Sequence, residues 1–209
     1  PADARAGWRR AADRMGVPYN AELGVTEQSQ DFTRHAHWDF ESRGTARFPL
    51  ADHVHYVELY RRQVVKQADL VLALHAAPEE FTPEQRRRDF DYYEPLTVRD
   101  SSLSAPVQAV VAAEIGYVEL AYDYARECAL LDLCDLRGST DGGLHVASLA
   151  GAWTAVVTGI VGLRHDDDGL RLAPRLPSRL TRLALAVHHG DARARVEVRP
   201  DGVTYRLES

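Results

Sequence analysis

The 209-residue sequence has few of the features that mark secreted or nucleic-acid-binding proteins. It contains only two cysteines, Cys128 and Cys134, whose spacing fits neither a CxxC metal pair nor a disulfide framework, so we expect free thiols and no metal site. No signal peptide is visible, and free thiols suit a reducing compartment, which predicts a cytoplasmic protein. The formal net charge is -6, and no face rich in lysine and arginine is evident. This charge argues against a nucleic-acid partner and against an anionic membrane surface.

A membrane-spanning helix is not expected either, although residues 143–163 carry no charged side chain. The segment is long enough to test as a span. His145, Ser148, Thr154 and Thr158 are spread along it, however, together with four glycines, and no aromatic belt flanks it. A helix with little charge on any side is otherwise one that is buried on all sides, so the segment predicts a buried helix of the protein core.

Hydrophobic periodicity predicts a mainly helical chain up to residue 163. The start at Thr82-Pro83 is a strong helix signal, and Ser101 or Ser102 can cap a helix that ends near Glu114 and Gly116. The expected helices cover about 4–15, 54–76, 84–92, 102–114, 117–131 and 144–160. Mostly buried helices alternate with amphipathic ones, and this alternation indicates an α/α toroid, in which an inner ring of helices is covered from outside.

The pattern changes after residue 163. Apolar and polar residues then alternate, as in Leu183, Leu185 and Val187, and turn residues separate the runs. We expect an antiparallel sheet of short strands. The predicted domains are therefore a helical part, 1–163, and a small antiparallel β segment, 164–209, which is too short to form a closed β domain by itself.

Three polar clusters interrupt the apolar helical stretches. They are Lys66-Gln67, Asp100-Ser101-Ser102, and His145 with Ser148. A buried polar group costs a few kcal/mol unless partners replace its water, so three such clusters predict one shared polar pocket. Two of the clusters stand at expected helix starts, where backbone N–H groups and the helix dipole favour an anion without a metal. Hydroxyls and an imidazole at these places suit a phosphate or a sugar.

The sequence around these clusters resembles the C-terminal third of glycoside hydrolase family 65. The resemblance is carried by long runs in one order, which are WRRAADRMGVPYNAELGVTEQ, VVKQADLVLAL, FTPEQRRRDFDYYEPLTVRDSSLS, AAEIGYVELAYDY, LDLCDLRGSTDGGLHVASLAGAW and RLAPRLPSRLTRLALAVHHG. It covers nearly the whole chain. The family contains inverting phosphorylases of maltose, trehalose, kojibiose and similar α-glucosides. The resemblance implies part of an (α/α)6 barrel, followed by a β-sandwich C-terminal domain that is incomplete here.

The resemblance also implies roles for individual residues. Lys66 and Gln67 match the pair that contacts the bound glucose unit. Ser101 and Ser102, in the DSSLS run, match the phosphate site, and His145 of the GLHVAS run completes it. Glu94, in the YYEPL run, is a further candidate, with a structural or a sugar-binding role.

No catalytic residue is expected within this chain. The family's general acid is a glutamate in a Gly-Pro-Asp-Glu-Tyr-like motif that precedes this segment, and the sequence has no such motif. The sequence also begins with Pro-Ala-Asp rather than Met, so we expect a fragment that is inactive alone and needs the missing N-terminal portion as its partner. The complete enzyme is expected to be a homo-oligomer.

The reaction implied for the complete enzyme is direct attack of phosphate on an α-linked glucose disaccharide. The products are β-glucose 1-phosphate and glucose, with inorganic phosphate as co-substrate and no cofactor. Two alternatives stay open. One is an inverting, trehalase-like α-glucoside hydrolase on the same scaffold, and the other is a non-catalytic partner piece.

Overall fold

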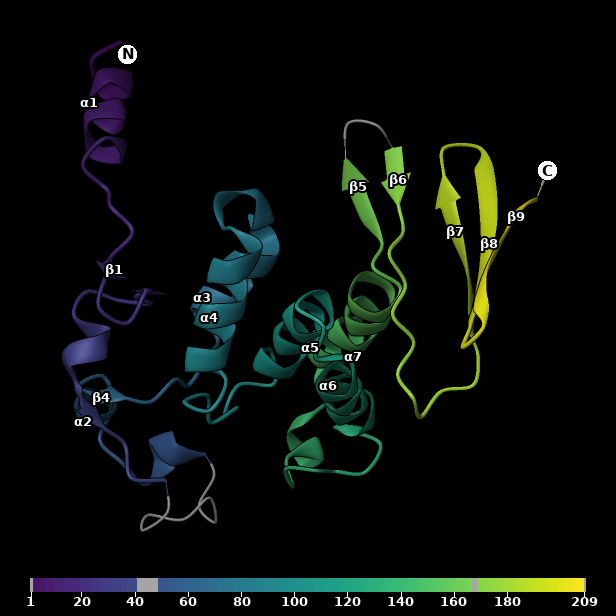
Figure 1. Cartoon of the computed structure of the whole chain (residues 1–209). Helices are drawn as coiled ribbons and strands as arrows, with labels where there is room; N and C mark the ends of the chain where they lie inside the picture. Colours follow the sequence, from purple (N-terminus) through teal and green to yellow (C-terminus); the bar gives the residue numbers. More distant parts are fainter. Residues whose placement is uncertain (1, 41–48, 167–168, 209) are drawn as a thin grey trace. The chain divides into compact units, whose positions relative to one another are not determined.

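The computed structural model describes residues 2–40, 49–166 and 169–208. By internal packing the chain divides into unit 1, Pro1–Val64, and unit 2, Val65–Ser209. In chain order, the elements of unit 1 are α1 (Ala2–Ala12), β1 (Tyr19–Asn20), β2 (Val25–Thr26), the 3-10 turns η1 (Phe32–Arg34) and η2 (Leu50–Asp52) with β3 (Ala36–His37) between them, α2 (Tyr56–Leu59) and β4 (Arg62–Gln63) (Figure 1).

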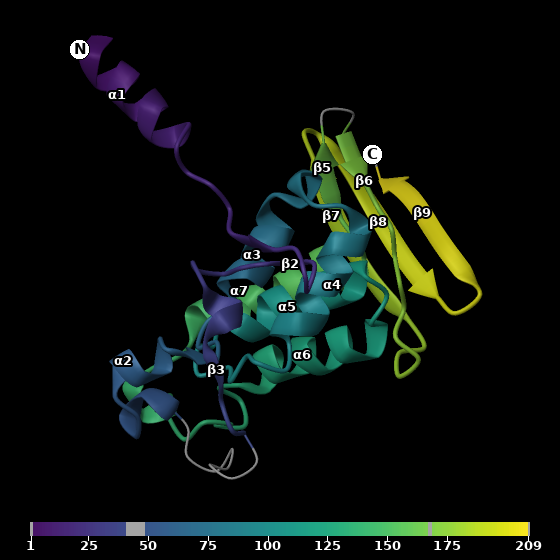
Figure 2. The same cartoon turned by 60° about the vertical axis from the view of Figure 1, so that its left-hand side comes forward.

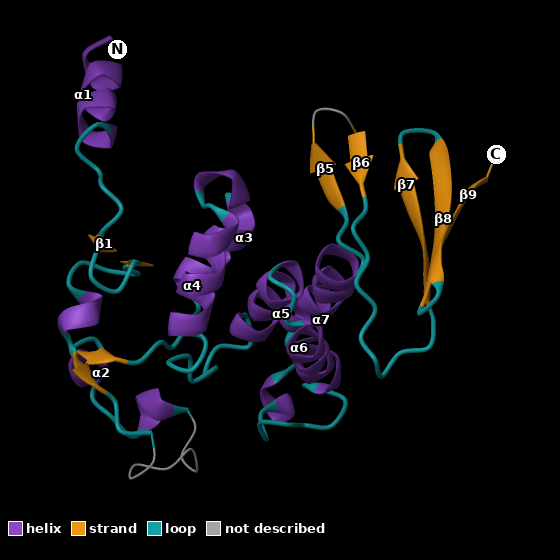
Figure 3. Ribbon diagram, in the orientation of Figure 1, coloured by secondary structure: helices purple, strands orange, loops and turns teal. Residues whose placement is uncertain are grey.

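Unit 2 is helical first and β-stranded afterwards, as Figure 3 shows by colour. Its helical elements are α3 (Asp69–Ala76), η3 (Pro78–Glu80), α4 (Pro83–Tyr93), α5 (Ser104–Glu114), α6 (Val118–Leu130), η4 (Thr140–Gly142), α7 (Val146–Thr154) and the π-helix η5 (Ala155–Ile160). Its strands are β5 (Arg164–Asp166), β6 (Gly169–Arg171), β7 (Leu183–His189), β8 (Ala192–Arg199) and β9 (Gly202–Glu208).

Helix α5 lies at the centre of the helical core of unit 2. It packs against α3, α6, α7 and η5, and both ribbon views show α5, α6 and α7 beside one another (Figures 1 and 2). Two glycines let the backbones approach: a Cβ added at Gly151 would lie 2.4 Å from Cγ of Pro106, and one added at Gly159 would lie 3.2 Å from Cα of Val110. The small residues of α5 and α7 therefore set how closely these helices pack.

The strands after residue 163 form antiparallel sheets, as the alternating pattern predicts. β5 pairs with β6, and β7, β8 and β9 form a three-stranded sheet in chain order. The β7–β8 turn contains Gly190 at φ 57°, a conformation that glycine adopts without steric cost. Val196 and Val198 of β8 are buried on one face of this sheet. The predicted boundary at residue 163 stays a prediction, since the division by packing concerns a different part of the chain.

The structure corrects the single helix predicted over 54–76. Helix α3 begins only at Asp69, and the short elements α2 and β4 precede it. Val65 instead forms a parallel bridge with Thr97, with hydrogen bonds from its N–H to the Leu96 carbonyl (2.8 Å) and to its carbonyl from the Val98 N–H (2.9 Å). This pairing with a distant segment extends the backbone, so Lys66 and Gln67 lie in a bend before α3 and not on a helix.

Two other local expectations are wrong. Ser101 and Ser102 do not cap α5, because the helix begins at Ser104, and the capping position is Leu103, which supplies no side-chain bond. The uncharged segment is helical as predicted, but it is not buried throughout. Its second part, η5, is mostly buried, whereas Val146 and Trp153 of α7 are exposed. Within the described ranges, no helix combines the length and the apolar character that crossing a membrane requires.

Candidate functional site

An open groove of about 410 Å³ lies between α3, α5 and α7, all within unit 2. Its walls are mostly apolar, with a few polar side chains from the starts of α3 and α5 and from the ends of α3 and α7. The lining residues are Gln67, Ala68, Asp69, Leu72, His75, Leu103, Ser104, Pro106, Val107, Val110, Ala147, Ala150, Gly151 and Thr154. A mainly apolar groove with a few convergent polar groups is the usual form of a small-molecule site.

The groove brings the three predicted polar clusters to one neighbourhood. Gln67 lines it directly. The Ala68 N–H donates to Oγ of Ser104 (3.4 Å), and this bond joins the bend that carries Lys66 and Gln67 to the start of α5. Ser102 immediately precedes Leu103 in the groove wall, while Ser101 accepts a bond from the Leu103 N–H (3.3 Å). The bend before α3 and the start of α5, which are distant in the sequence, thus line one groove.

Not every predicted site residue lies in the groove wall. Lys66 is exposed, which contradicts the expected burial among apolar neighbours, and it is the only lysine in the sequence. Ser101, Ser102 and His145 are half-buried and border the lining residues along the chain without belonging to them. Among the predicted site residues, Gln67 is therefore the one that lines the groove.

Glu94 is held in a separate polar network. It ends α4, and its carboxylate accepts a hydrogen bond from the Tyr124 hydroxyl of α6. Arg99 donates to the same hydroxyl (3.2 Å) and also pairs with Glu127 (3.5 Å). Burial raises the pKa of Tyr124, and the Glu94 carboxylate raises it further, so the phenol stays protonated and continues to donate.

The loop that carries Ser101 and Ser102 is fixed from the same side. Arg99 adopts a left-handed backbone conformation, with φ 54°. The Arg137 guanidinium donates to the Asp100 carbonyl (2.9 Å) and pairs with Glu127 (3.5 Å). A non-glycine residue at positive φ is costly and persists only where the surroundings hold it. Here the ion pairs of Arg99 and Arg137 with Glu127, and the bond from Arg137 to Asp100, hold this turn.

His145 stands at the N-cap of α7 and is bound twice by Asp132. Its backbone N–H donates to Oδ2 of Asp132 (2.8 Å), and its ring Nδ1 lies 2.6 Å from Oδ1. The side chain of Asp132 is only 5% exposed. The hydrogen bond from the His145 ring holds the pKa of the Asp132 carboxyl below its ordinary value, so this carboxylate is ionised near neutral pH.

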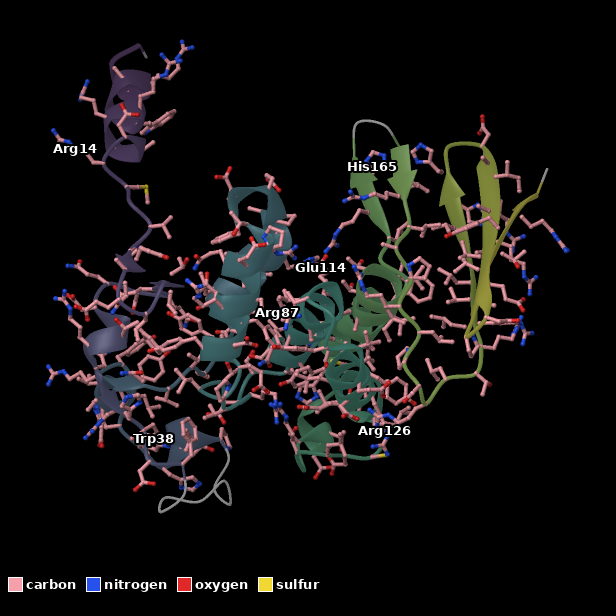
Figure 4. All side chains as sticks on the ribbon, in the orientation of Figure 1. Arg14, Trp38, Arg87, Glu114, Arg126 and His165 are labelled. Carbon is pink, nitrogen blue, oxygen red and sulfur yellow. The ribbon has the colours of Figure 1, made fainter. Side chains whose placement is uncertain are left out.

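A second charged cluster lies next to His75, a lining residue of the groove. Glu114, labelled in Figure 4, forms ion pairs with both Arg86 and Arg164. His75, which lines the groove, has its Nδ1 3.3 Å from the Arg164 guanidinium. Burial lowers the pKa of His75, and the nearby arginines lower it further, so the ring that lines the groove is neutral near neutral pH.

Sequence reasoning missed the residues that hold the predicted site in place. Tyr124, Glu127, Asp132 and Arg137 all come from α6 and the turn after it, which the sequence presents as an ordinary amphipathic helix and its end. No local pattern marks them, because each acts on a partner that is at least ten residues away.

Comparisons with known proteins relate both parts of the chain to one family. The glycosyl hydrolase family 65 central catalytic domain matches residues 2–154, and the C-terminal domain of the same family matches residues 163–209. An uncharacterized glycosyl hydrolase of Mycobacterium leprae is 53% identical over 97% of this chain and 25% of that protein. An alpha,alpha-trehalose phosphorylase of Geobacillus stearothermophilus is 38% identical over 96% of this chain and 26% of that protein.

The fold is likewise similar to that of a solved structure, "Putative kojibiose phosphorylase from human microbiome". The TM-score is 0.89 at 28% identity, over 98% of this chain and 28% of that one. The predicted fold class is therefore confirmed as part of an (α/α)6 barrel followed by a small antiparallel β segment. The chain spans about a quarter of the length of the curated relatives it matches. On these matches, the chain belongs to glycosyl hydrolase family 65.

Proposed function

We propose that this chain is part of a disaccharide phosphorylase and supplies the phosphate site and part of the glucose site. The observation that carries the proposal is the convergence of Gln67, the start of α5 and the start of α7 on one groove. The start of α7 carries His145, whose ring is held by a buried carboxylate. Phosphorylases of trehalose, maltose and kojibiose are among the relatives that align over most of the chain.

The proposed reaction is inverting. A phosphate oxygen attacks the anomeric carbon of the α-glucosyl unit, and the bond from that carbon to the bridging oxygen breaks. A general acid outside this chain donates its proton to the leaving oxygen, so the products are β-glucose 1-phosphate and glucose. Ser101, Ser102 and His145 hold the phosphate, while Lys66 and Gln67 bind the glucose hydroxyls and Glu94 supports the sugar side. Phosphate is the co-substrate, and the mechanism needs no cofactor.

Phosphorolysis places a particular demand on the protein. An inverting hydrolase needs a second carboxylate to activate water, whereas a phosphorylase needs a cradle for an anion. The hydroxyls of Ser101 and Ser102 just before α5, together with the imidazole of His145 at the start of α7, would suit such an anion cradle. The half-buried positions of Ser101, Ser102 and His145 leave them reachable from solvent in this chain.

Hydrolysis is the second candidate. The relatives with 52–53% identity to this chain are named as uncharacterized glycosyl hydrolases, so their names do not specify phosphate as the acceptor. A trehalase-like hydrolase on the same scaffold would release two free sugars and would ignore phosphate.

The deciding experiment uses a polypeptide that joins this chain to the preceding part of a family barrel. Free glucose and glucose 1-phosphate are measured during a phosphate titration, with trehalose, maltose and kojibiose as substrates. We expect equal amounts of the two products and a strict need for phosphate. His145→Ala should raise the KM for phosphate far more than the KM for disaccharide, while His188→Ala, in an exposed position on β7, serves as the matched control. Two free glucoses at a rate indifferent to phosphate would replace this proposal with the hydrolase.

The isolated chain provides a separate test of its role as one part of an enzyme. We expect the purified 209-residue polypeptide to release no sugar from these disaccharides with phosphate, because the general acid lies elsewhere. Turnover by the isolated chain would show that it contains a complete catalytic centre. Its cytoplasmic location and the homo-oligomeric state of the complete enzyme remain predictions.

A further inference from the structure

One segment of unit 2 contacts three of the four segments that carry the predicted anion and sugar residues, namely those of Glu94, of the serine pair and of His145. We call residues 124–137, the second half of α6 and the turn after it, the supporting segment. Its Tyr124 donates to Glu94, its Arg137 donates to the carbonyl of Asp100 just before the serine pair, and its Asp132 binds His145. None of these three residues lines the groove. The segment therefore acts on the site through other residues.

We propose that Asp132 is a positioning residue, which fixes the His145 ring with the proton on Nδ1 and presents Nε2 to a phosphate oxygen. This inference rests on the proposed function for the identity of the ligand, but the orientation of the ring follows from the geometry alone. An ionised carboxylate can only accept hydrogen bonds. At 2.6 Å from Oδ1, the Nδ1 of His145 must therefore carry the proton.

The second bond from Asp132 makes this orientation rigid. Oδ2 accepts the backbone N–H of His145 (2.8 Å), so one carboxylate holds both the ring and the first turn of α7. The carboxylate is 5% exposed, so water competes little for either bond. Asp135 accepts bonds from the N–H groups of Ser139 (2.9 Å) and Thr140 (3.2 Å), which fixes the turn that leads to His145.

The contact with Asp132 affects both the direction of the free ring nitrogen of His145 and the charge that the ring can carry. With Nδ1 occupied, Nε2 is the ring atom that remains for a ligand, and the His145 side chain is 27% exposed. When the ring is protonated, Nε2–H can donate to a phosphate oxygen, and Asp132 balances the positive charge behind it. Charge-assisted bonds of this kind are shorter and stronger than neutral ones.

The test is the tautomer of His145 in the 209-residue chain itself. Histidine is labelled with nitrogen-15, and the ring nitrogens are observed by NMR in wild type, with the His145 signals identified by their loss in His145→Gln. In Asp132→Asn the amide oxygen can still accept the backbone N–H, which keeps the helix start. The amide NH2 then faces Nδ1, and the proton should move to Nε2. Asp141→Asn, an exposed position in the same turn region, is the control for the loss of one negative charge.

We expect the Nδ1–H form in wild type and in Asp141→Asn, and the Nε2–H form in Asp132→Asn. Inorganic phosphate should shift the His145 signals of wild type. Its affinity should fall by about ten-fold in Asp132→Asn, because that ring lacks the carboxylate that balances a protonated imidazole and offers phosphate a neutral Nε2–H in place of a charge-assisted one. If Asp132→Asn does not fold, Asp132→Glu keeps a carboxylate and should retain the Nδ1–H form.

The outcomes separate the two claims. The same tautomer in wild type and Asp132→Asn would overturn the positioning role, whatever phosphate does, and so would the Nε2–H form in wild type. An inverted tautomer in Asp132→Asn, without any response of the wild-type signals to phosphate, would support the action of Asp132 on the ring and overturn phosphate as its ligand. A merely structural helix cap would change stability but would leave the tautomer as it is.

Discussion

Helices α5 and α7 are both mainly apolar in sequence, but α5 is buried whereas α7 is largely exposed. The sequence of α5 is SAPVQAVVAAE and that of α7 is VASLAGAWT, so the two contain a single charged side chain between them, Glu114. Nine of the eleven residues of α5 are buried. In α7 only Ser148 is buried, while Val146 and Trp153 are 69% and 61% exposed.

The difference shows that an apolar sequence predicts a buried helix but does not tell whether this chain or another part of the enzyme buries it. The chain itself covers α5, with α3, α6, α7 and η5 around it (Figure 2). The outer face of α7 has no such cover among the described residues. The relatives are about four times as long as this chain, so we infer that this face of α7 packs against a part of the complete enzyme outside the matched segment.

The same substitution in both helices gives the largest expected effect. Val111 of α5 is fully buried, so Val111→Asp places an unpaired carboxylate in the core and should lower the free energy of unfolding by about 3–5 kcal/mol. Val146→Asp on α7 should change it by no more than about 0.5 kcal/mol. Urea unfolding followed by circular dichroism measures both. Equal losses would mean that α7 is also covered in the isolated chain.

Lys66, a predicted glucose-site residue, is exposed in this chain, as the outer face of α7 is. Lys66→Ala should leave stability unchanged. In the joined polypeptide, kcat/KM for disaccharide should fall by about ten-fold or more, since a charge-assisted bond to a sugar is worth roughly 1.5–3 kcal/mol. Unchanged kinetics would place Lys66 outside the glucose site.

The isolated chain offers a direct check on the same residue. Because Lys66 is the only lysine, an amine-reactive reagent has a single side-chain target, and peptide mass spectrometry separates it from the terminal amine. Glucose should slow the modification of Lys66 if the glucose contact forms in this chain. The rate at the terminal amine is the internal control.

The sequence predicts best the features that depend on nearby residues. The start of α4 is one: Pro83 stands at its first turn, and Oγ1 of Thr82 accepts the Gln85 N–H (3.1 Å), a bond that spans three residues. The break before α3 could not be predicted, because it depends on the pairing of Val65 with Thr97, and propensity is a weak guide where tertiary contacts decide.

In the candidate site, too, features that depend on a local motif could be predicted, and contacts between distant residues could not. Gln67 could be named from the family motif and does line the groove. The contact of Asp132 with His145 spans thirteen residues and a turn, so no periodic pattern reveals it. Gly151 and Pro106 both line the groove, and their close approach is a property of two helices and not of either sequence alone.

The close packing of α7 against α5 can be tested by adding a side chain at Gly151. Gly151→Leu would place a Cβ 2.4 Å from Cγ of Pro106 and should cost about 1–3 kcal/mol of stability through overpacking. Gly142→Leu is the matched control, because a Cβ there has no atom within 4 Å, and it should be nearly neutral. Thermal unfolding of both variants measures the contrast. Equal stability of the two variants would show that the helices separate without cost.

The sharpest test of the uncovered face is expected at Trp153, with little effect on the stability of the isolated chain. Exposed apolar side chains gather at α7 and just before it, where Leu144 and Leu149 join Val146 and Trp153. Apolar patches of this kind promote association between proteins. Trp153→Ser should change the free energy of unfolding by no more than about 0.5 kcal/mol, because a largely exposed side chain loses little on truncation.

The same substitution should nevertheless reduce self-association of the isolated chain, measured as the average mass in sedimentation across a concentration series. Trp8→Ser is the matched control, since Trp8 is 70% exposed on α1. If α7 presents the uncovered barrel face, mass should fall in Trp153→Ser and stay unchanged in Trp8→Ser. In the joined polypeptide Trp153→Ser should then become destabilising, because the preceding part of the barrel would bury this side chain. A Trp153→Ser variant as stable as wild type in that polypeptide would show that α7 faces solvent in the complete enzyme as well, and the contrast between α5 and α7 would be a property of the fold and not of a missing partner.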